Sequence, residues 1–133
     1  MLFPNEQVHT DFIHPNLIYK NSLENMQLDV FIPNLNLAFE YQGKQHYNES
    51  IFPTGKIAQS MMDKEKLEAC KMFGITLIEV PYWWDFSVNS LVATIKKERS
   101  DLLVDIENSN GTPIPQINKG GNKISKKIDS LII

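Results

Sequence analysis

The sequence predicts an α/β fold in which a mixed β-sheet is flanked by helices. Three observations lead to this class: two short apolar runs within residues 28–41, an amphipathic pattern over residues 57–73, and a β-branched run at residues 75–80. The first two runs are separated by Pro33-Asn34-Leu35-Asn36, and a Pro/Asn cluster between apolar runs is typical of a hairpin. The order strand, strand, helix, strand indicates a helix that crosses over and returns a strand to the sheet.

We divide the chain into three parts. Residues 1–25 form an N-terminal lead-in of the kind that is left when a longer protein is cut. Within it, the segment 14–19 fits an edge strand or a loop packed on the sheet. Residues 26–107 form the core. Residues 108–133 are rich in Asn, Gly, Pro, Lys and Ser, and we expect a flexible basic tail there because this composition buries little apolar surface.

The pattern over residues 57–73 predicts one amphipathic helix that ends at Gly74. Its apolar stripe consists of Ala58, Met61, Met62, Ala69, Cys70 and Phe73. A neighbouring side carries Gln59, Asp63, Lys66 and Cys70. Cys70, the single cysteine of the chain, is expected to be a buried helix residue.

Residues 75–80 predict a buried strand that Pro81 ends. The aromatic pair Trp83-Trp84 follows, and we interpret it as an anchor for the next helix on the sheet. Stacking on bases, or docking on another protein, are the alternatives. Ser87 is the expected N-cap of a last helix over 88–99, whose inward residues are Val88, Leu91, Val92 and Ile95.

Composition and charge limit the locations and partners that the sequence allows. No apolar run reaches the roughly 18–20 residues of a membrane span, so no membrane partner is expected. The start has no signal-peptide pattern and one cysteine cannot form an internal disulfide, so we expect an intracellular location, cytoplasmic or nuclear. Residues 111–133 carry four lysines and one acid, whereas residues 1–110 carry nine basic and fifteen acidic residues. This asymmetry indicates an acidic body with a basic arm, or a solvated tail.

Two acids interrupt the apolar runs of the hairpin: Asp29 in the first and Glu40 in the second. A carboxylate within a buried strand is costly unless something compensates it, and a metal ion is one such compensation. Glu40 and Gln42 share a strand face, and the hairpin register directs Asp29 at the same place. The pattern therefore predicts an oxygen-lined divalent-cation site, with a purely structural, hydrogen-bonded acid pair as the alternative.

Asp29, Glu40-Tyr41-Gln42, the following Gln45-His46-Tyr47 and the order of elements resemble the PD-(D/E)XK nuclease superfamily, most closely its very-short-patch-repair-like branch. The resemblance covers about residues 26–85. It implies a restriction-endonuclease-like fold and Mg²⁺- or Mn²⁺-dependent hydrolysis of phosphodiester bonds in nucleic acid, DNA more than RNA. The implied metal ligands are Asp29, Glu40 and the Tyr41 carbonyl.

The usual lysine of the family falls at Gln42, which cannot carry a positive charge. Lys66 or Lys44 is expected to supply that charge, and His46 is a candidate general acid or base. The expected nucleic-acid contacts come from lysines of the core and tail, namely Lys44, Lys64, Lys119, Lys123, Lys126 and Lys127. The alternative function is a catalytically inactive nuclease-fold module that binds nucleic acid or a protein.

Overall fold

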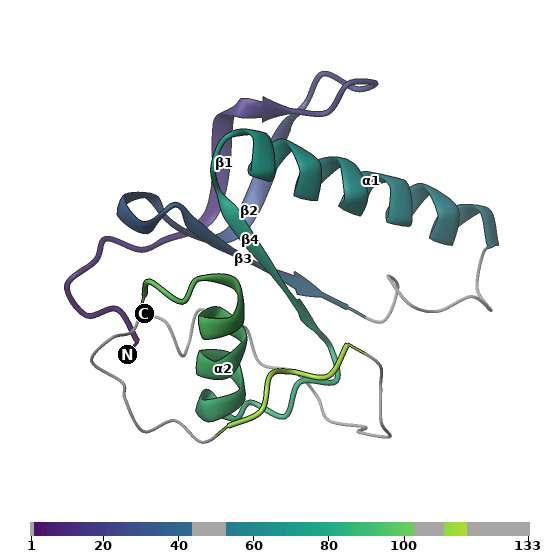
Figure 1. The fold of residues 1–133 in the computed structure, drawn as a ribbon. Helices are drawn as coiled ribbons and strands as arrows, with labels where there is room; N and C mark the ends of the chain where they lie inside the picture. The colour runs from purple at the N-terminus through teal and green to yellow at the C-terminus, as the bar shows by residue number, and fades with distance from the viewer. Residues whose placement is uncertain (1, 44–52, 103–110, 117–133) are drawn as a thin grey trace.

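The computed structural model describes residues 2–43, 53–102 and 111–116, and within them the chain is a mixed α/β domain. A four-stranded sheet contains β1 (His9–Ile18), β2 (Asn25–Ile32), β3 (Leu37–Gln42) and β4 (Thr76–Pro81) in that spatial order. The first three strands are antiparallel, and β4 runs parallel to β3. Helix α1 (Pro53–Met72) connects β3 to β4, and α2 (Val88–Glu98) follows β4 (Figure 1). The predicted mixed sheet flanked by helices is confirmed.

The β2–β3 hairpin agrees with the predicted strands. Val30 pairs with Phe39 and Ile32 with Leu37, and the short 3-10 helix η1 (Pro33–Leu35) makes the connection. Asn36 then adopts a left-handed conformation with φ of 50° and ψ of 45°, which Asn tolerates better than most residues. The turn chemistry of the Pro/Asn cluster therefore fixes which residues of the two strands face each other.

Strand β1 lies at one edge of the sheet and pairs with β2, so the expectation of an edge strand in this region is confirmed. The strand begins at His9, earlier than the segment 14–19 suggested, and the sheet thus includes part of the lead-in. Leu17 is its one buried side chain, which suits a strand on the rim of the core.

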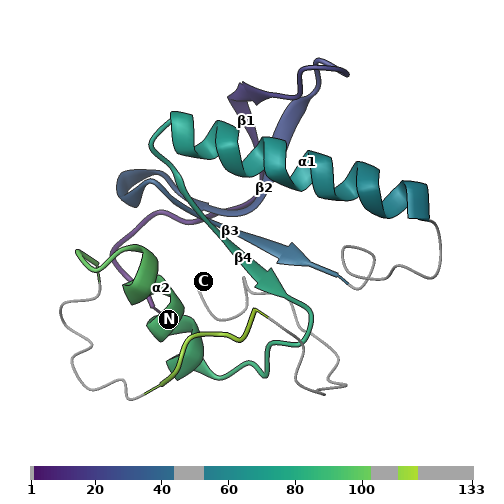
Figure 2. The ribbon, with the colours of Figure 1, turned by 45° about the vertical axis from the view of Figure 1, so that its right-hand side comes forward.

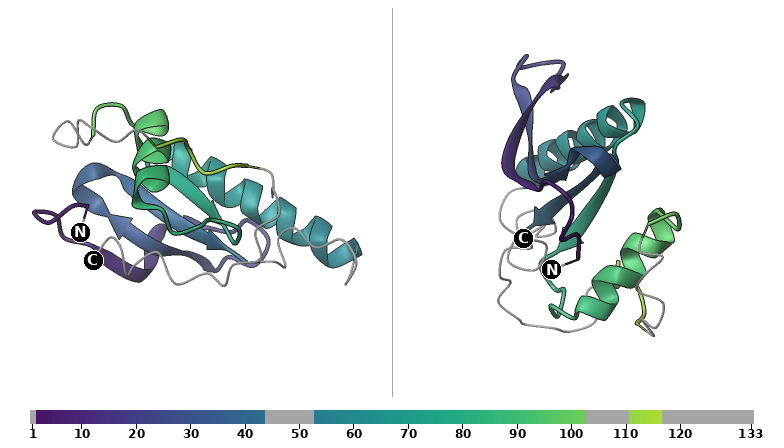
Figure 3. Two further views of the ribbon diagram at one scale, coloured as in Figure 1. Left: turned by 90° about the horizontal axis from the view of Figure 1, so that it is seen from below. Right: turned by 90° about the vertical axis from the view of Figure 1, so that its left-hand side faces the viewer.

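The two faces of the sheet carry separate apolar clusters, because alternate residues of a strand point to opposite faces. The helices cover these opposite faces, as the right-hand panel of Figure 3 shows edge-on. The cluster under α2 contains Val30, Ile32, Leu37, Phe39, Ile78, Val80, Leu91 and Ile95. The cluster under α1 contains Leu28, Phe31, Ala38, Cys70, Ile75 and Leu77.

Helix α1 presents a different side to the sheet from the one predicted. Met61 and Met62 are 67% and 45% exposed and Phe73 is 52% exposed, whereas Lys66 and Cys70 are buried. The apolar stripe was therefore wrong for these three residues, although the prediction for Cys70 is confirmed. The reason is tertiary: α1 runs across one face of the sheet (Figure 2) and packs on β4 and β1, and where Lys66 reaches β3 it meets the acid Glu40 rather than an apolar residue. The polar side of the helix matches this acid better.

Helix α2 agrees with prediction except at its first residue. Ser87 is the N-cap, and its side chain accepts a hydrogen bond from the Ser90 backbone N–H. Leu91, Val92 and Ile95 are buried. Val88 is 43% exposed, so the prediction that it faces inward is wrong; it is the first residue of the helix, and the buried stripe begins at Leu91.

The tryptophan pair anchors this region, as interpreted from the sequence. Trp84 is 2% exposed within the α2 cluster, and its Nε1 donates to Ser90 Oγ at 2.8 Å. Trp83 is half-buried and donates through Nε1 to the Pro115 carbonyl. The indole of Trp84 therefore ties the end of β4 to the first turn of α2.

Part of the predicted flexible tail packs on the core. Ile114 is 7% exposed in the α2 cluster, and its backbone N–H donates to Thr94 Oγ1 at 3.0 Å. The expectation of a free tail is thus wrong for residues 111–116, because one isoleucine between prolines suffices to dock a short segment. The lysines at 119–127 lie outside the described residues. Among the helices that the structure describes, none is both long enough and apolar enough to span a membrane.

Candidate metal and catalytic site

Asp29 and Glu40 lie one step beyond Val30 and Phe39, the pair at which the β2–β3 ladder ends. At this step, side chains replace backbone carbonyls as hydrogen-bond acceptors. The Asp29 backbone N–H donates to Glu40 Oε2 at 3.3 Å, and the Tyr41 backbone N–H donates to Asp29 Oδ2 at 2.7 Å. Each carboxylate therefore accepts from the backbone of the opposite strand, and the structure brings together the two acids that the sequence singled out.

Lys66 joins this pair from α1. Its Nζ lies 2.6 Å from Glu40 Oε1 and donates a hydrogen bond to it. The Lys66 side chain is 9% exposed and that of Glu40 is 19% exposed, so the ion pair is mostly shielded from water. Both oxygens of Glu40 are thus engaged, one by Lys66 and the other by the Asp29 backbone.

The surroundings of Glu40 act on its pKa in opposite directions. Burial raises the pKa of the Glu40 carboxyl above its usual range, because desolvation disfavours the charged form. The charge and hydrogen bond of Lys66 lower this pKa, whereas the negative charge of Asp29 raises it. The site therefore places two carboxylates in a partly desolvated position with one cation to balance them.

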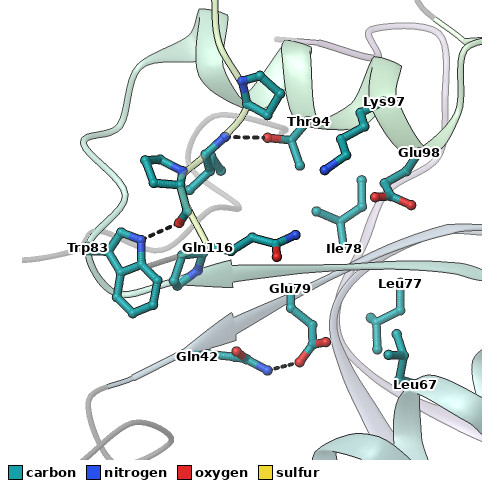
Figure 4. A pocket seen from close by; sticks show the side chains of 14 residues that line it. Gln42, Leu67, Leu77, Ile78, Glu79, Trp83, Thr94, Lys97, Glu98 and Gln116 are labelled. Carbon is teal, nitrogen blue, oxygen red and sulfur yellow. Dashed lines mark hydrogen bonds between the residues drawn. The ribbon is translucent and has the colours of Figure 1, made fainter. Parts of the chain in front are cut away.

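Gln42 has a partner that the sequence analysis missed. Its side chain is buried, and its Nε2 donates to the Glu79 carboxylate on β4 (Figure 4). Glu79 stands opposite Glu40 in the parallel β3–β4 register. The signal was present in the sequence, because Glu79 is an acid inside an apolar strand run, just as Asp29 and Glu40 are.

The donor set suits a hard cation such as Mg²⁺. Asp29 Oδ1 accepts no hydrogen bond within the part of the chain that the structure describes, and carboxylate and carbonyl oxygens are the ligands that Mg²⁺ prefers. The same residues contain no group of three or more His, Cys, Asp or Glu side chains able to hold a metal ion. A cation at Asp29 and Glu40 would therefore depend on the Tyr41 carbonyl and on water to complete its shell.

The remaining predicted residues do not join the site in the described structure. Lys44 and His46, like the four tail lysines, fall outside the described residues. Lys64 is exposed and lies two positions from Lys66, so the two lysines do not share a side of α1. Lys64 instead lines a cavity of about 660 Å³ together with Tyr19 and Met61.

A second cavity, of about 400 Å³, adjoins the Gln42–Glu79 pair at the outer edge of β4. Figure 4 shows Thr94, Lys97 and Glu98 of α2 on its other side, with Trp83 at one end. Gln42 lies on β3 two residues after Glu40, and Glu79 stands opposite Glu40 on β4, so β3 connects this cavity to the Asp29–Glu40 pair.

The chain is similar to three iridescent- or frog-virus proteins. It is 38% identical over 74 residues to "Uncharacterized protein 094L" of Frog virus 3 (isolate Goorha), an alignment that covers 52% of this chain and 48% of that protein. It is 42% identical over 62 residues to "Uncharacterized protein 033L" of Invertebrate iridescent virus 3, covering 44% and 32%. It is 34% identical over 88 residues to "Uncharacterized protein 307L" of Invertebrate iridescent virus 6, covering 59% and 43%.

The matched part thus spans less than half the length of each of these relatives, and their names state no activity. No family model matches the chain, and no solved structure matches it.

Proposed function

We propose that this protein is a metal-dependent endonuclease of the PD-(D/E)XK type, which hydrolyses phosphodiester bonds of nucleic acid, DNA in preference to RNA. The observation that carries the proposal is the grouping of Asp29, Glu40 and Lys66. Each of two acids on adjacent strands accepts a hydrogen bond from the backbone of the other strand at the end of the β2–β3 ladder. The Nζ of Lys66, on the crossover helix, lies 2.6 Å from Oε1 of Glu40. Two carboxylates and a cation are the groups that phosphodiester hydrolysis with a divalent metal requires.

The order of the elements also supports a restriction-endonuclease-like fold. Three antiparallel strands are followed by a helix and by a strand parallel to the third. The acids occupy the second and third strands, where the resemblance to the superfamily expects them. The position of the two acids within this order of elements is the reason that we include the fold in the proposal.

Asp29, Glu40 and the Tyr41 carbonyl would hold the cation. When bound, Mg²⁺ or Mn²⁺ would activate a water and polarise the phosphate. Lys66 supplies the positive charge that Gln42 lacks. Its long stem lets the ammonium move from Glu40 toward a phosphate oxygen, where negative charge accumulates in the transition state. Lys66 would thus neutralise the charge of Glu40 when no metal is bound, and would neutralise charge on the phosphate when metal and substrate are bound.

A cleavage assay tests this proposal directly. Labelled single-stranded and double-stranded DNA and RNA are incubated with Mg²⁺, with Mn²⁺, or with a chelator. We expect cleavage of DNA that depends on metal and that is abolished in Asp29→Asn and in Glu40→Gln. Glu68→Gln, which changes an exposed acid on α1, is the matched control and retains activity. Cleavage that survives both site substitutions would place the chemistry elsewhere.

A second candidate function is an inactive nuclease-fold module that binds nucleic acid or a protein. One observation favours it: Lys66 and the Asp29 backbone satisfy both oxygens of Glu40 with no metal needed. Titration with Mn²⁺ separates the two candidates. Binding that requires Asp29 and Glu40 favours the nuclease, whereas no binding at these acids favours the inactive module.

A further inference from the structure

The hydrogen bond between Gln42 and Glu79 fixes which end of the Gln42 amide faces β4. An ionised carboxylate only accepts hydrogen bonds, whereas a glutamine amide has a donor end and an acceptor end. The NH₂ group of Gln42 must therefore face Glu79, as it does in Figure 4, and the amide oxygen Oε1 must point away from that carboxylate. The chemistry of the partner, rather than the shape of the amide, decides this orientation.

The position of the pair relates it to the acids. Gln42 lies two residues after Glu40 on β3 and shares its strand face. Glu79 stands opposite Glu40 on β4, on the α1-facing side that also carries Leu77. Gln42 is 6% exposed, so a reversed amide would turn its carbonyl oxygen toward the half-buried carboxylate of Glu79. That arrangement is strongly unfavourable.

We propose that Glu79 is a positioning residue that sets the orientation of the Gln42 amide and makes Gln42 an acceptor in the candidate site. The role of this acceptor in hydrolysis rests on the proposed function, but the orientation itself does not. An acceptor at this position can orient a water through one of its protons or act as a neutral oxygen ligand. It cannot imitate the lysine usual in the family, which only donates.

Three substitutions of Glu79 differ in hydrogen-bonding capacity and therefore in the orientation of the Gln42 amide that they allow. Glu79→Gln offers both a donor and an acceptor, so it allows either orientation of Gln42. Glu79→Met keeps a similar length but offers no useful partner. Glu79→Lys only donates and demands the reversed amide. Glu98→Gln is the matched control, because Glu98 is an exposed acid that lines the same cavity from α2.

The first measurement uses the full chain and needs no activity. The side-chain amide signals of Gln42 in a ¹⁵N–¹H spectrum are assigned by their loss in Gln42→Met. In the native protein and in Glu98→Gln we expect slow hydrogen exchange of this NH₂, since it is buried and bonded. Exchange should be fast in Glu79→Met and intermediate in Glu79→Gln. An NH₂ that exchanges equally fast in the native protein and in Glu79→Met would overturn the proposed orientation.

The second measurement is metal-dependent DNA cleavage by the same variants. We expect activity to fall by roughly 10- to 100-fold in Glu79→Met, the range found when a partner that orients a ligand is removed. The order should be native, then Glu79→Gln, then Glu79→Met, with Glu79→Lys lowest. In a Gln42→Met background these differences should vanish, which a merely structural role of Glu79 would not cause.

The outcomes distinguish the two proposals. Loss of amide protection in Glu79→Met without loss of cleavage would overturn the positioning role while leaving the nuclease intact. An inactive native protein would overturn the proposed function, and the exchange measurement would still decide whether Glu79 orients Gln42. Thermal unfolding of each variant shows that it is folded before either result is interpreted.

Discussion

Lys66 Nζ lies 2.6 Å from Glu40 Oε1, and this contact joins the crossover helix α1 to the third strand of the sheet. The pair is mostly buried, and the oxygen of Glu40 that does not contact Lys66 accepts from the Asp29 backbone. A pair of this kind adds little net stability by itself, because the desolvation of both charges offsets their attraction. Its value lies in placing a cation next to the candidate metal ligands.

Breaking this pair from one side should destabilise the protein. Lys66→Met leaves a buried carboxylate without its cation, which costs about 3 kcal/mol of unfolding free energy at neutral pH. The double variant Lys66→Met/Glu40→Gln removes the charge as well and should recover much of that loss. Urea unfolding of both variants and of Glu40→Gln measures these differences. Equal losses in the single and double variants would show that the charge of Glu40 is solvated without Lys66.

The loss caused by Lys66→Met should depend on pH. Burial raises the pKa of Glu40 and Lys66 lowers it, so removing the lysine raises that pKa further. The folded variant then binds a proton at Glu40 in a range of pH where Glu40 of the folded native protein is still ionised. Its stability relative to the native protein should therefore rise as pH falls through the pKa of Glu40 in the variant, and should level off once Glu40 of the native protein is protonated as well.

Thermal unfolding of native protein and Lys66→Met over this pH range measures the effect. The gap between the two melting temperatures should narrow as the solution becomes more acidic. A gap that stays constant across the range would mean that Glu40 does not titrate as the burial of its carboxyl requires.

Divalent metal should stabilise the folded protein. A cation that binds Asp29 and Glu40 in the folded state alone raises the melting temperature by mass action, by an amount that grows with metal concentration. Asp29→Asn together with Glu40→Gln should abolish this shift, whereas Glu68→Gln should retain it. Differential scanning calorimetry with Mg²⁺ and Mn²⁺ provides the measurement. An undiminished shift in the double variant would locate the ion at another place.

Turnover should depend on Lys66 more than on other lysines. Lys66→Ala removes the cation beside the acids, and loss of one preorganised donor lowers turnover by roughly 10²- to 10³-fold. Lys44→Ala should mainly weaken substrate affinity. Lys64→Ala serves as control, since Lys64 is exposed and does not share a side of α1 with Lys66. Single-turnover cleavage at saturating DNA separates the two effects, and a full rate in Lys66→Ala would exclude its catalytic role.

Two truncations should separate the packed part of the C-terminal region from its lysines. Deleting residues 111–133 removes Ile114 from the α2 cluster, which should cost about 2 kcal/mol or more of unfolding free energy. Deleting residues 117–133 keeps Ile114, so the difference in unfolding free energy between the two truncations measures the contribution of residues 111–116. Both truncations remove four lysines and should flatten the salt dependence of DNA binding. An unchanged salt slope in both would rule out phosphate contacts by the tail.

The sequence alone determined the elements whose signals are local. The Pro/Asn cluster and the apolar runs on either side gave the β2–β3 hairpin, and Ser87 gave the start of α2. The acids Asp29 and Glu40 were also predictable, because a carboxylate in an apolar strand conflicts with its context. The hairpin register then implied that the two acids lie together.

Only the tertiary structure decided which side of α1 faces the sheet. Hydrophobic spacing placed Met61, Met62 and Phe73 inward together with Cys70. Cys70 does face the sheet, but Lys66 faces it as well, and the other three are exposed. The partners of that helix face, Glu40 above all, are distant in the sequence, so no local pattern contains them. The Gln42–Glu79 contact likewise depends on the β3–β4 register, which pairs two strands that the crossover helix separates in the sequence. A buried polar group is stabilised by its hydrogen-bond partner, and only the tertiary fold brings together partners that are distant in the sequence.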